Sequence, residues 1–378
     1  MNRVLTRRAT GVAALSVVAA VAMAACSPPE KSSGSGSSGG VSAATATSAA
    51  DLGGMDKLVD AAKKEGKLNV IALPPDWANY GAIIKAFQAK YGITITSAQP
   101  DASSADEIAA AKRLKGQGSA PDVFDLGSAV ALANTSMFTP YKVATWNDIG
   151  ADFKEPTGLW VNDYGGYMSI GYNTAKVPAV TSVDDLTKPA YKGKVALNGD
   201  PTKAGAAFAG VQMVSVSQGG TVGDISKGVD FFKTLKKDGN FIPVDPTPAT
   251  IQSGQTPVVI DWDYTNAALT PKLPTWKVLV PSNAVVAGYY FQAISKDAPH
   301  PAAARLWQEY LFSDEGQNLY LKGGARPVRF DAMKKAGTLD ETAAAALPTV
   351  KGTPIVPAQD DSAKATAYLT KNWANAVG

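Results

Sequence analysis

The sequence predicts an α/β protein folded into two lobes, and three observations support this prediction. The chain has 378 residues, of which 45% are hydrophobic and 18% are charged, a composition typical of globular proteins. From Asp51 onward, short apolar runs alternate with amphipathic segments of helical length, which predicts βαβ units and a mostly parallel sheet. About 328 residues follow residue 50, more than a single hydrophobic core usually holds.

The first part of this body is expected to alternate three strands with two helices. Residues 80–91 place Ile83, Ile84 and Phe87 on one face at helical spacing, and Gly92 then ends the helix. The predicted strands are 67–73, 93–97 and 122–126, and the second predicted helix is 105–115.

The middle and carboxyl-terminal parts repeat this alternation. A long strand-like run covers residues 160–173, and a helix over residues 225–237 turns Val229, Phe232 and Leu235 inward. The further predicted strands are 194–198, 256–262, 277–280 and 288–295. The further predicted helices are 204–217, 301–321 and 363–373.

Residues 1–25 are predicted to be a lipoprotein signal peptide. Arg3, Arg7 and Arg8 precede an uncharged stretch over residues 11–25 that is rich in Ala and Val. A spanning helix needs about 20 apolar residues, so a membrane anchor helix is the less favoured alternative. The sole cysteine, Cys26, follows directly, and its flank resembles the lipobox of bacterial lipoproteins, which implies acylation of Cys26. The exported protein is then expected to be a lipoprotein on the outer face of the cytoplasmic membrane, with Sec and twin-arginine export both open.

Residues 26–50 are predicted to form a disordered linker. Beyond Cys26 they are almost entirely Ser, Gly, Ala, Thr and Pro, and such a segment cannot bury enough apolar surface to offset its backbone entropy. A linker of this length has a root-mean-square reach of roughly 25 to 30 Å. The folded body is therefore expected to be held near the membrane but free of it.

Charge and residue counts argue against several function classes. The formal net charge is +3, and removal of the three leader arginines leaves 33 basic and 33 acidic residues. A neutral protein has no long-range field that attracts a polyphosphate, so no nucleic-acid partner is predicted. One Cys and one His cannot supply a structural zinc site or a disulfide, and neither a P-loop nor a Gly-x-Gly-x-x-Gly motif occurs. No metal and no cofactor are predicted.

Four stretches of the sequence carry a resemblance to a known family. Residues 298–307 and 310–317 resemble a helix followed by a second helix that opens with Ser-x-Glu-Gly-Gln, and residues 122–126 and 170–174 match two further family stretches. Together with the leader and linker, they are similar to the extracellular solute-binding proteins of ABC importers. The chain most resembles the spermidine/putrescine and ferric-ion binding subgroups, over residues 57 to about 329.

This resemblance implies a two-lobed, type 2 periplasmic-binding fold with two chain crossings and a central cleft. Lobe one is expected to comprise residues 51–162 plus 285–330, and lobe two residues 163–284. Residues 331–378 are expected to form helices that pack on the lobes. The implied partners are a small-molecule ligand and an ABC transporter permease, and the protein is expected to be a monomer without enzymatic activity. Hinge closure over the ligand is the expected motion.

In such a fold, ligand residues lie at the carboxyl ends of strands and on the crossing strands. Here these places carry carboxylates interleaved with Trp and Tyr. This pattern favours an amine-bearing ligand such as a polyamine, because ring faces attract alkylammonium groups and carboxylates accept their N–H donors. The predicted ligand residues are Asp76, Trp77, Tyr80, Ser128, Asp163, Tyr164, Asp261, Trp262, Asp263, Tyr289 and Tyr290.

Several alternatives stay open at this point. The aspartates are also compatible with helix capping or with Lys and Arg partners, and the aromatic residues with core packing. Thr202 and Lys203 lie in a segment that opens a helix, which is compatible either with an ordinary turn or with binding of a phosphonate or zwitterion. A ferric ion is a further ligand alternative. A secreted glycosidase that uses paired carboxylates is the alternative from a different class.

Overall fold

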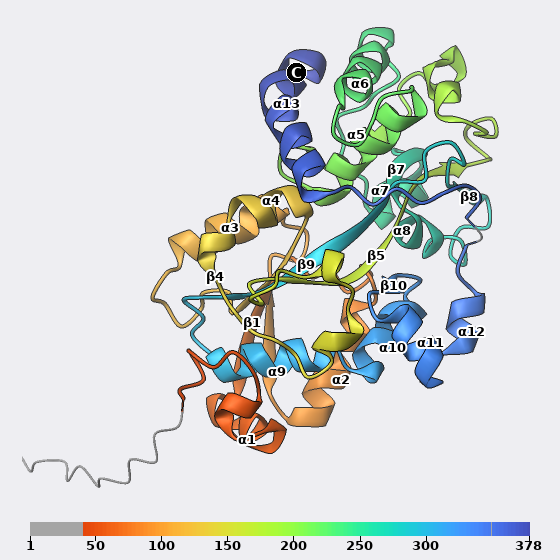
Figure 1. Cartoon of the computed structure of the whole chain (residues 1–378). Coiled ribbons are helices and arrows are strands. Elements are labelled where there is room, and N and C mark those ends of the chain that lie inside the picture. The colour runs from red at the N-terminus through yellow and green to blue at the C-terminus, as the bar shows by residue number, and fades with distance from the viewer. Residues whose placement is uncertain (1–40, 349) are drawn as a thin grey trace, which may run out of the picture. The chain divides into compact units, whose positions relative to one another are not determined.

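The computed structural model describes residues 41–348 and 350–378 (Figure 1). The predicted signal peptide, Cys26 and the first part of the predicted linker lie outside the described residues. Within these ranges, no helix is both long and apolar enough to cross a membrane.

Lobe one begins with alternating helices and strands. Its amphipathic helix α2 ends at Gly92, which adopts the left-handed conformation that the sequence predicts for a helix stop. The strands β1 and β2 pair in parallel, and β3 joins a separate sheet. The elements are α1 (Met55–Glu65), β1 (Lys67–Ile71), α2 (Tyr80–Tyr91), β2 (Thr94–Ala98), α3 (Ser104–Arg113), β3 (Val123–Leu126), α4 (Ser128–Ala133) and β4 (Phe138–Thr139).

Two strands, β5 (Val161–Asn173) and β9 (Ala287–Ser295), connect the lobes. The first half of β5 pairs antiparallel with β9, and its second half pairs antiparallel with β7 (Val258–Trp262) and β8 (Trp276–Leu279). Strand β5 therefore links β9 to β7 and β8 within one sheet, which has eight strands in the described part of the chain.

The prediction of a mostly parallel sheet is wrong. Among the described strands, only β1 with β2 and β6 (Val195–Leu197) with β7 run parallel. The long crossing strands β5 and β9 return the chain between lobes, and each pairs antiparallel with its neighbours in the sheet.

Lobe two adds four helices to this sheet: α5 (Gly205–Ser217), α6 (Ser226–Asp238), α7 (Pro248–Ser253) and α8 (Asp263–Ala267). Residues 206–215 of α5 are all buried, as expected for a helix that is apolar on every side. Helix α6 is amphipathic and buries Val229, Phe232 and Leu235, as predicted.

The chain returns to lobe one through α9 (Pro301–Leu311), α10 (Asp314–Lys322), β10 (Arg326–Pro327), α11 (Phe330–Ala336) and α12 (Glu341–Ala345). Helix α13 (Gln359–Val377) then packs beside α6 (Figure 1), where Trp373 lies edge-on against Phe232 with ring centroids 5.3 Å apart. Short 3₁₀ segments occupy Ala50–Leu52, Thr135–Met137, Trp146–Asp148, Ala151–Phe153, Val183–Thr187 and Pro189–Tyr191.

The last residues of the predicted linker are part of the folded body, which corrects the boundary at residue 50. Arg305, fully buried on α9, donates from Nε to the carbonyl of Ala46 at 2.8 Å and from Nη2 to that of Ala44 at 3.0 Å. Ala46 is itself fully buried. The composition of this segment is typical of a linker. Its carbonyl groups are nevertheless bound by Arg305, a partner about 260 residues away that the local sequence does not reveal.

Candidate functional site

A cavity of about 840 Å³ lies between the two lobes. Lobe one contributes the loop after β1, the first turn of α3 and the end of β3. Lobe two contributes the turn between β6 and α5, the end of β7 and parts of α7 and α8, and Tyr290 enters from β9. The cavity thus lies at the carboxyl ends of strands, where α/β folds bind ligands.

Residues of the two lobes are in contact next to this cavity. Gly127 and Gly205 approach so closely that a Cβ atom on Gly127 would lie 2.5 Å from the Cα atom of Gly205. The amide of Ala105 donates to the carbonyl of Lys203 at 3.4 Å, and Lys272 pairs with Asp76 at 3.9 Å. The cavity therefore keeps its volume in an arrangement in which the lobes are already in contact.

Three buried carboxylates line the cavity: Glu107, Asp125 and Asp261. Glu107 Oε2 accepts the backbone amide of Asp125 at 3.1 Å, so these two residues are adjacent. Asp125 Oδ2 accepts the Tyr164 hydroxyl at 2.9 Å, whereas its Oδ1 has no hydrogen-bond partner among the described residues. The carboxylate of Asp261 accepts Asn198 Nδ2 at 2.9 Å and its neighbouring Trp262 amide at 2.7 Å.

Burial makes the negative charge of these groups costly. It raises the pKa of Asp125 to about 7 and that of Asp261 to about 7, in each case against the lowering effect of hydrogen bonds. Burial, followed by the charge of Asp125, raises the pKa of Glu107 well above its usual value. The three carboxyl groups would all gain from a positive charge in the cavity.

The residues that line the cavity supply no such charge to them. Its two lysines, Lys203 and Lys272, pair with Asp200 at 3.6 Å and with Asp76 at 3.9 Å, and each is more than half exposed. Over the described ranges, no group of three or more His, Cys, Asp and Glu side chains is arranged to hold a metal ion. The arrangement is therefore a desolvated acidic site without an internal counter-ion.

Aromatic side chains support the carboxylates. Trp77 and Tyr290 line the cavity with their rings at 79° and centroids 5.6 Å apart. The indole of Trp77 donates to the Tyr164 hydroxyl at 2.6 Å, and that hydroxyl donates to Asp125. The indole of Trp262 donates to the Tyr290 hydroxyl at 3.4 Å. Ring faces and carboxylates thus border the same space, an arrangement that suits an alkylammonium group.

The structure divides the predicted site residues into three groups. Asp76, Trp77, Asp261 and Tyr290 line the cavity, and so does Lys203 of the predicted anion site. Tyr80, Asp163 and Tyr164 lie behind it in a buried network, in which the Tyr320 hydroxyl donates to Asp163 at 2.8 Å. The remaining residues, Ser128, Thr202, Trp262, Asp263 and Tyr289, are not among the lining residues of this cavity.

The prediction that Asp263 is a ligand carboxylate is wrong. Asp263 is fully buried, its Oδ2 pairs with Arg326 at 2.7 Å, and its Oδ1 accepts the backbone amides of Tyr167 and Tyr264. Strand β7 ends at Trp262 and helix α8 begins at Asp263, so the alternation that would point Asp261 and Asp263 the same way does not continue. Its partner is 63 residues away in the sequence.

The adjacent pair Tyr289 and Tyr290 is split by the pleat of β9. Tyr290 faces the cavity, and Tyr289 instead packs against Phe153 with centroids 4.8 Å apart. Successive residues of a strand point to opposite faces, so only one member of the pair reaches the site.

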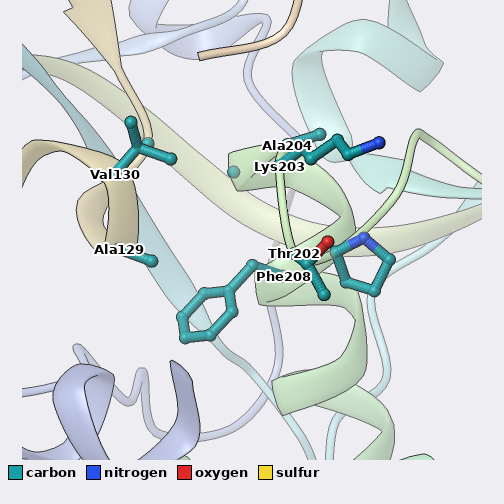
Figure 2. A pocket seen from close by; sticks show the side chains of 9 residues that line it. Ala129, Val130, Thr202, Lys203, Ala204 and Phe208 are labelled. Carbon is teal, nitrogen blue, oxygen red and sulfur yellow. The ribbon is translucent and has the colours of Figure 1, made fainter. Parts of the chain in front are cut away.

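In the turn that contains Thr202 and Lys203, the carboxylate of Asp200 binds both of these residues. Asp200 Oδ1 accepts the amide of Thr202 at 2.9 Å and its hydroxyl at 2.7 Å, and Asp200 Oδ2 pairs with Lys203. The small pocket beside this turn, bordered by Ala129, Val130 and Phe208, has a volume of about 10 Å³ (Figure 2), which is room for about one water molecule. This pocket is too small for a phosphonate, and Asp200 already pairs with the Lys203 side chain.

The predicted ligand residues leave out three residues of the site, Glu107, Asp125 and Asn198. Asp125 lies near the end of β3 (Val123–Leu126), so its place at the end of a strand was a signal for it. Glu107 follows the capping box formed by Ser103 and Asp106 at the start of α3, where a glutamate is ordinary. Only its burial, at 1% exposure, marks it as unusual. Asn198 follows β6 directly, so its place at the end of a strand was the one available signal.

Comparisons with known proteins identify the family of this chain. The family model described as bacterial extracellular solute-binding protein matches residues 120–351. Among curated sequences, none matches the chain.

Solved structures share the fold at low sequence identity. A ferric binding protein from Campylobacter jejuni is 19% identical with a TM-score of 0.61, covering 82% of this chain and 99% of its own. The periplasmic binding protein AfuA from Actinobacillus pleuropneumoniae, with fructose-6-phosphate bound, is 17% identical with a TM-score of 0.60, covering 82% and 97%. AgtB from A. tumefacien R10, in complex with agropinic acid, is 16% identical with a TM-score of 0.62, covering 82% and 98%.

These likenesses confirm the predicted two-lobed, type 2 periplasmic-binding fold. The family model covers well over half of the chain. The chain therefore belongs to the family of bacterial extracellular solute-binding proteins.

Proposed function

We propose that this protein captures an amine-bearing cation in the cavity between its lobes and delivers it to an ABC-type import permease, without chemical turnover. The observation that carries the proposal is the set of buried carboxylates Glu107, Asp125 and Asp261, which lack a basic partner within the described part of the chain. The unpartnered Oδ1 atom of Asp125 is the clearest acceptor for a ligand N–H group.

The two lobes share these acceptors. Glu107 and Asp125 belong to lobe one, whereas Asp261 is the next-to-last residue of strand β7 in lobe two. A cation between them is attracted by both lobes at once, so its binding favours the closed arrangement over an open one. Trp77 and Tyr290 provide ring faces for the alkyl groups next to the charge.

Proteins with the same fold bind other classes of ligand. The buried carboxylates of this cavity do not favour the anionic ones. An anion such as the fructose-6-phosphate named for AfuA would meet three desolvated carboxylates here. Such like-charge juxtaposition costs several kcal/mol, typically. A cationic ligand instead relieves the desolvation of these groups.

The proposal includes the location of the protein and its organisation. Cleavage after residue 25 and acylation of Cys26 would leave a monomeric lipoprotein on the outer face of the cytoplasmic membrane. The lobes would be divided at residues 162/163 and 284/285, within or next to β5 and β9.

Calorimetric titration with alkylamines, a phosphonate, fructose-6-phosphate and ferric citrate tests the ligand class. We expect amines to release or absorb heat on binding and to raise the melting temperature. At a ligand concentration a hundredfold above Kd, binding should stabilise the folded state by about 2.7 kcal/mol. Binding of the anions or of iron with no response to any amine would refute it.

A further inference from the structure

We infer that the solute is a single ammonium group on a bulky, mainly apolar body, and not a linear polyamine. This inference rests on the proposed function, because it takes the carboxylates Glu107, Asp125 and Asp261 as the ammonium site. It adds the size of the ligand and the chemistry of its far end.

The size follows from the cavity volume and the lobe contacts. The lobes already touch through Gly127 and Gly205 and through Asp76 and Lys272, and about 840 Å³ remains between them. Cavities of about 300–1,000 Å³ hold drug-sized ligands. A small diamine would leave most of the cavity filled with water.

The single charge follows from where the carboxylates are desolvated. The other acids that line the cavity are engaged or solvated. Asp76 has a side chain 72% exposed and pairs with Lys272, and Asp200 accepts hydrogen bonds from Thr202. Asp106 forms the capping box with Ser103, and Asp101 and Asp245 are exposed. Only Glu107, Asp125 and Asp261 gain substantially from a ligand charge, because only they are removed from water.

The apolar body follows from the wall supplied by α7, α8 and neighbouring loops. Ile251 and Leu269 line the cavity from a small hydrophobic cluster that also contains Val259 and Trp276. Prolines and alanines also line the cavity, four from the loops after β1 and β2 and three on or beside α7 and α8: Pro74, Pro75, Pro100, Ala102, Pro246, Pro248 and Ala268. Polar residues line the cavity from the same elements: Asp245, Thr247, Thr265, Asn266 and Lys272. Among them, Thr265 Oγ1 is a buried hydroxyl without a partner among the described residues.

Matched amines test the inference on the detergent-solubilised full-length chain. Calorimetric titration compares n-butylammonium, n-hexylammonium, n-octylammonium and 1,6-diaminohexane at constant ionic strength. We expect the affinity of the monoamines to rise roughly three- to fourfold for each added methylene. We also expect n-hexylammonium to bind at least tenfold more tightly than 1,6-diaminohexane, whose second charge would lie against the apolar wall.

A negative charge added at Ala268 should reverse the preference for n-hexylammonium over 1,6-diaminohexane. Ala268 is exposed and lines the cavity at the end of α8, so A268D adds a carboxylate without disturbing the core. In A268D, 1,6-diaminohexane should bind better than n-hexylammonium. The matched control is A249D on α7, since Ala249 is exposed and is not among the lining residues, and it should keep the original order.

The outcomes separate this inference from the proposed function. If 1,6-diaminohexane binds the unmodified protein as tightly as n-hexylammonium or more tightly, the inference is overturned and the amine site stands. The inference also fails if affinity does not change with chain length. If no amine binds at all, the proposed function itself fails.

Discussion

Gly127 of lobe one and Gly205 of lobe two meet backbone to backbone, and neither has room for a side chain. A Cβ atom on Gly205 would lie 2.7 Å from the Cα atom of Gly127. Neither residue is among those with a positive φ angle, so the requirement for glycine here comes from the close approach of the two lobes and not from backbone conformation.

Gly205→Ala should therefore weaken ligand binding without unfolding the protein. The added methyl group opposes the closed arrangement by about 1–3 kcal/mol, which corresponds to an affinity loss of about 5- to 150-fold. Calorimetry with the best amine measures the loss, and X-ray scattering should show a smaller decrease in radius of gyration on ligand addition. Gly118→Ala is the control, because a Cβ atom there meets nothing within 4 Å. Equal affinities for the two variants would contradict this role of the glycine contact.

Asp261→Asn and Asp125→Asn should each lower amine affinity strongly. Removal of one partner of a desolvated charge pair costs about 2–5 kcal/mol, or about 30-fold to several thousandfold in Kd. Melting temperatures measured on the same samples should not fall, because neutralising an unpaired buried carboxylate removes a desolvation cost. Unchanged Kd values in both variants would exclude these groups from the ligand site.

Asp263→Asn should have the opposite profile. It breaks the buried pair with Arg326, whose Nη1 lies 2.7 Å from Asp263 Oδ2, and loss of one partner of such a pair costs about 3–5 kcal/mol of folding stability. We expect a marked fall in melting temperature and a near-normal Kd at a temperature where the variant is folded. A large loss of affinity in a fully folded Asp263→Asn protein would return this residue to the ligand site.

Amine affinity should rise with pH between about 6 and 8. Burial raises the pKa of Asp125 and of Asp261 to about 7 in the free protein, and an ammonium ion binds the deprotonated carboxylates. Protons are then released on binding at neutral pH. Calorimetry in two buffers with different ionisation enthalpies counts these protons, and the Asp125→Asn/Asp261→Asn double variant should release fewer. Proton uptake, or affinity that falls over this range, would contradict the prediction.

The stability of the ligand-free protein should show the reverse trend. Unfolded aspartates titrate near 3.9, so between about pH 4 and 7 the folded state holds protons that the unfolded state has lost. The free energy of unfolding therefore falls as pH rises through this range. Urea denaturation at pH 5 and pH 7.5 measures the change, which should be smaller in the double variant. A larger or equal change in the double variant would assign the effect to other groups.

Replacement of Cys26 should release the protein from the membrane. In the sequence Cys26 directly follows the apolar stretch of the leader, and its acylation is the proposed anchor. Cys26→Ser should move the exported protein to the soluble fraction in detergent partitioning and leave its amine affinity unchanged. A Cys26→Ser protein that remains in the detergent phase would refute the lipid anchor.

Local pattern was sufficient to place many of the helices and strands, although not to give the direction in which the strands pair. The helix predicted at residues 80–91 is α2 (Tyr80–Tyr91), and the long strand predicted at 160–173 is β5 (Val161–Asn173). Hydrophobic periodicity and glycine stops act within a few residues, so they can be read directly from the chain. The ends of the strands also indicated that Trp77 and Asp261 would line a cleft, and the crossing strand indicated the same for Tyr290.

Tertiary structure alone decided which polar groups are free. Asp261 and Asp263 are two residues apart and look equivalent in the sequence, yet Arg326 neutralises Asp263, whereas Asp261 has no basic partner among the described residues. Glu107 looks like an ordinary helix residue until α3 buries it beside Asp125, and the carbonyls of Ala44 and Ala46 look like linker until Arg305 binds them. Secondary structure depends on neighbours in sequence, whereas the energy of a buried charge depends on partners that the chain brings from tens or hundreds of residues away.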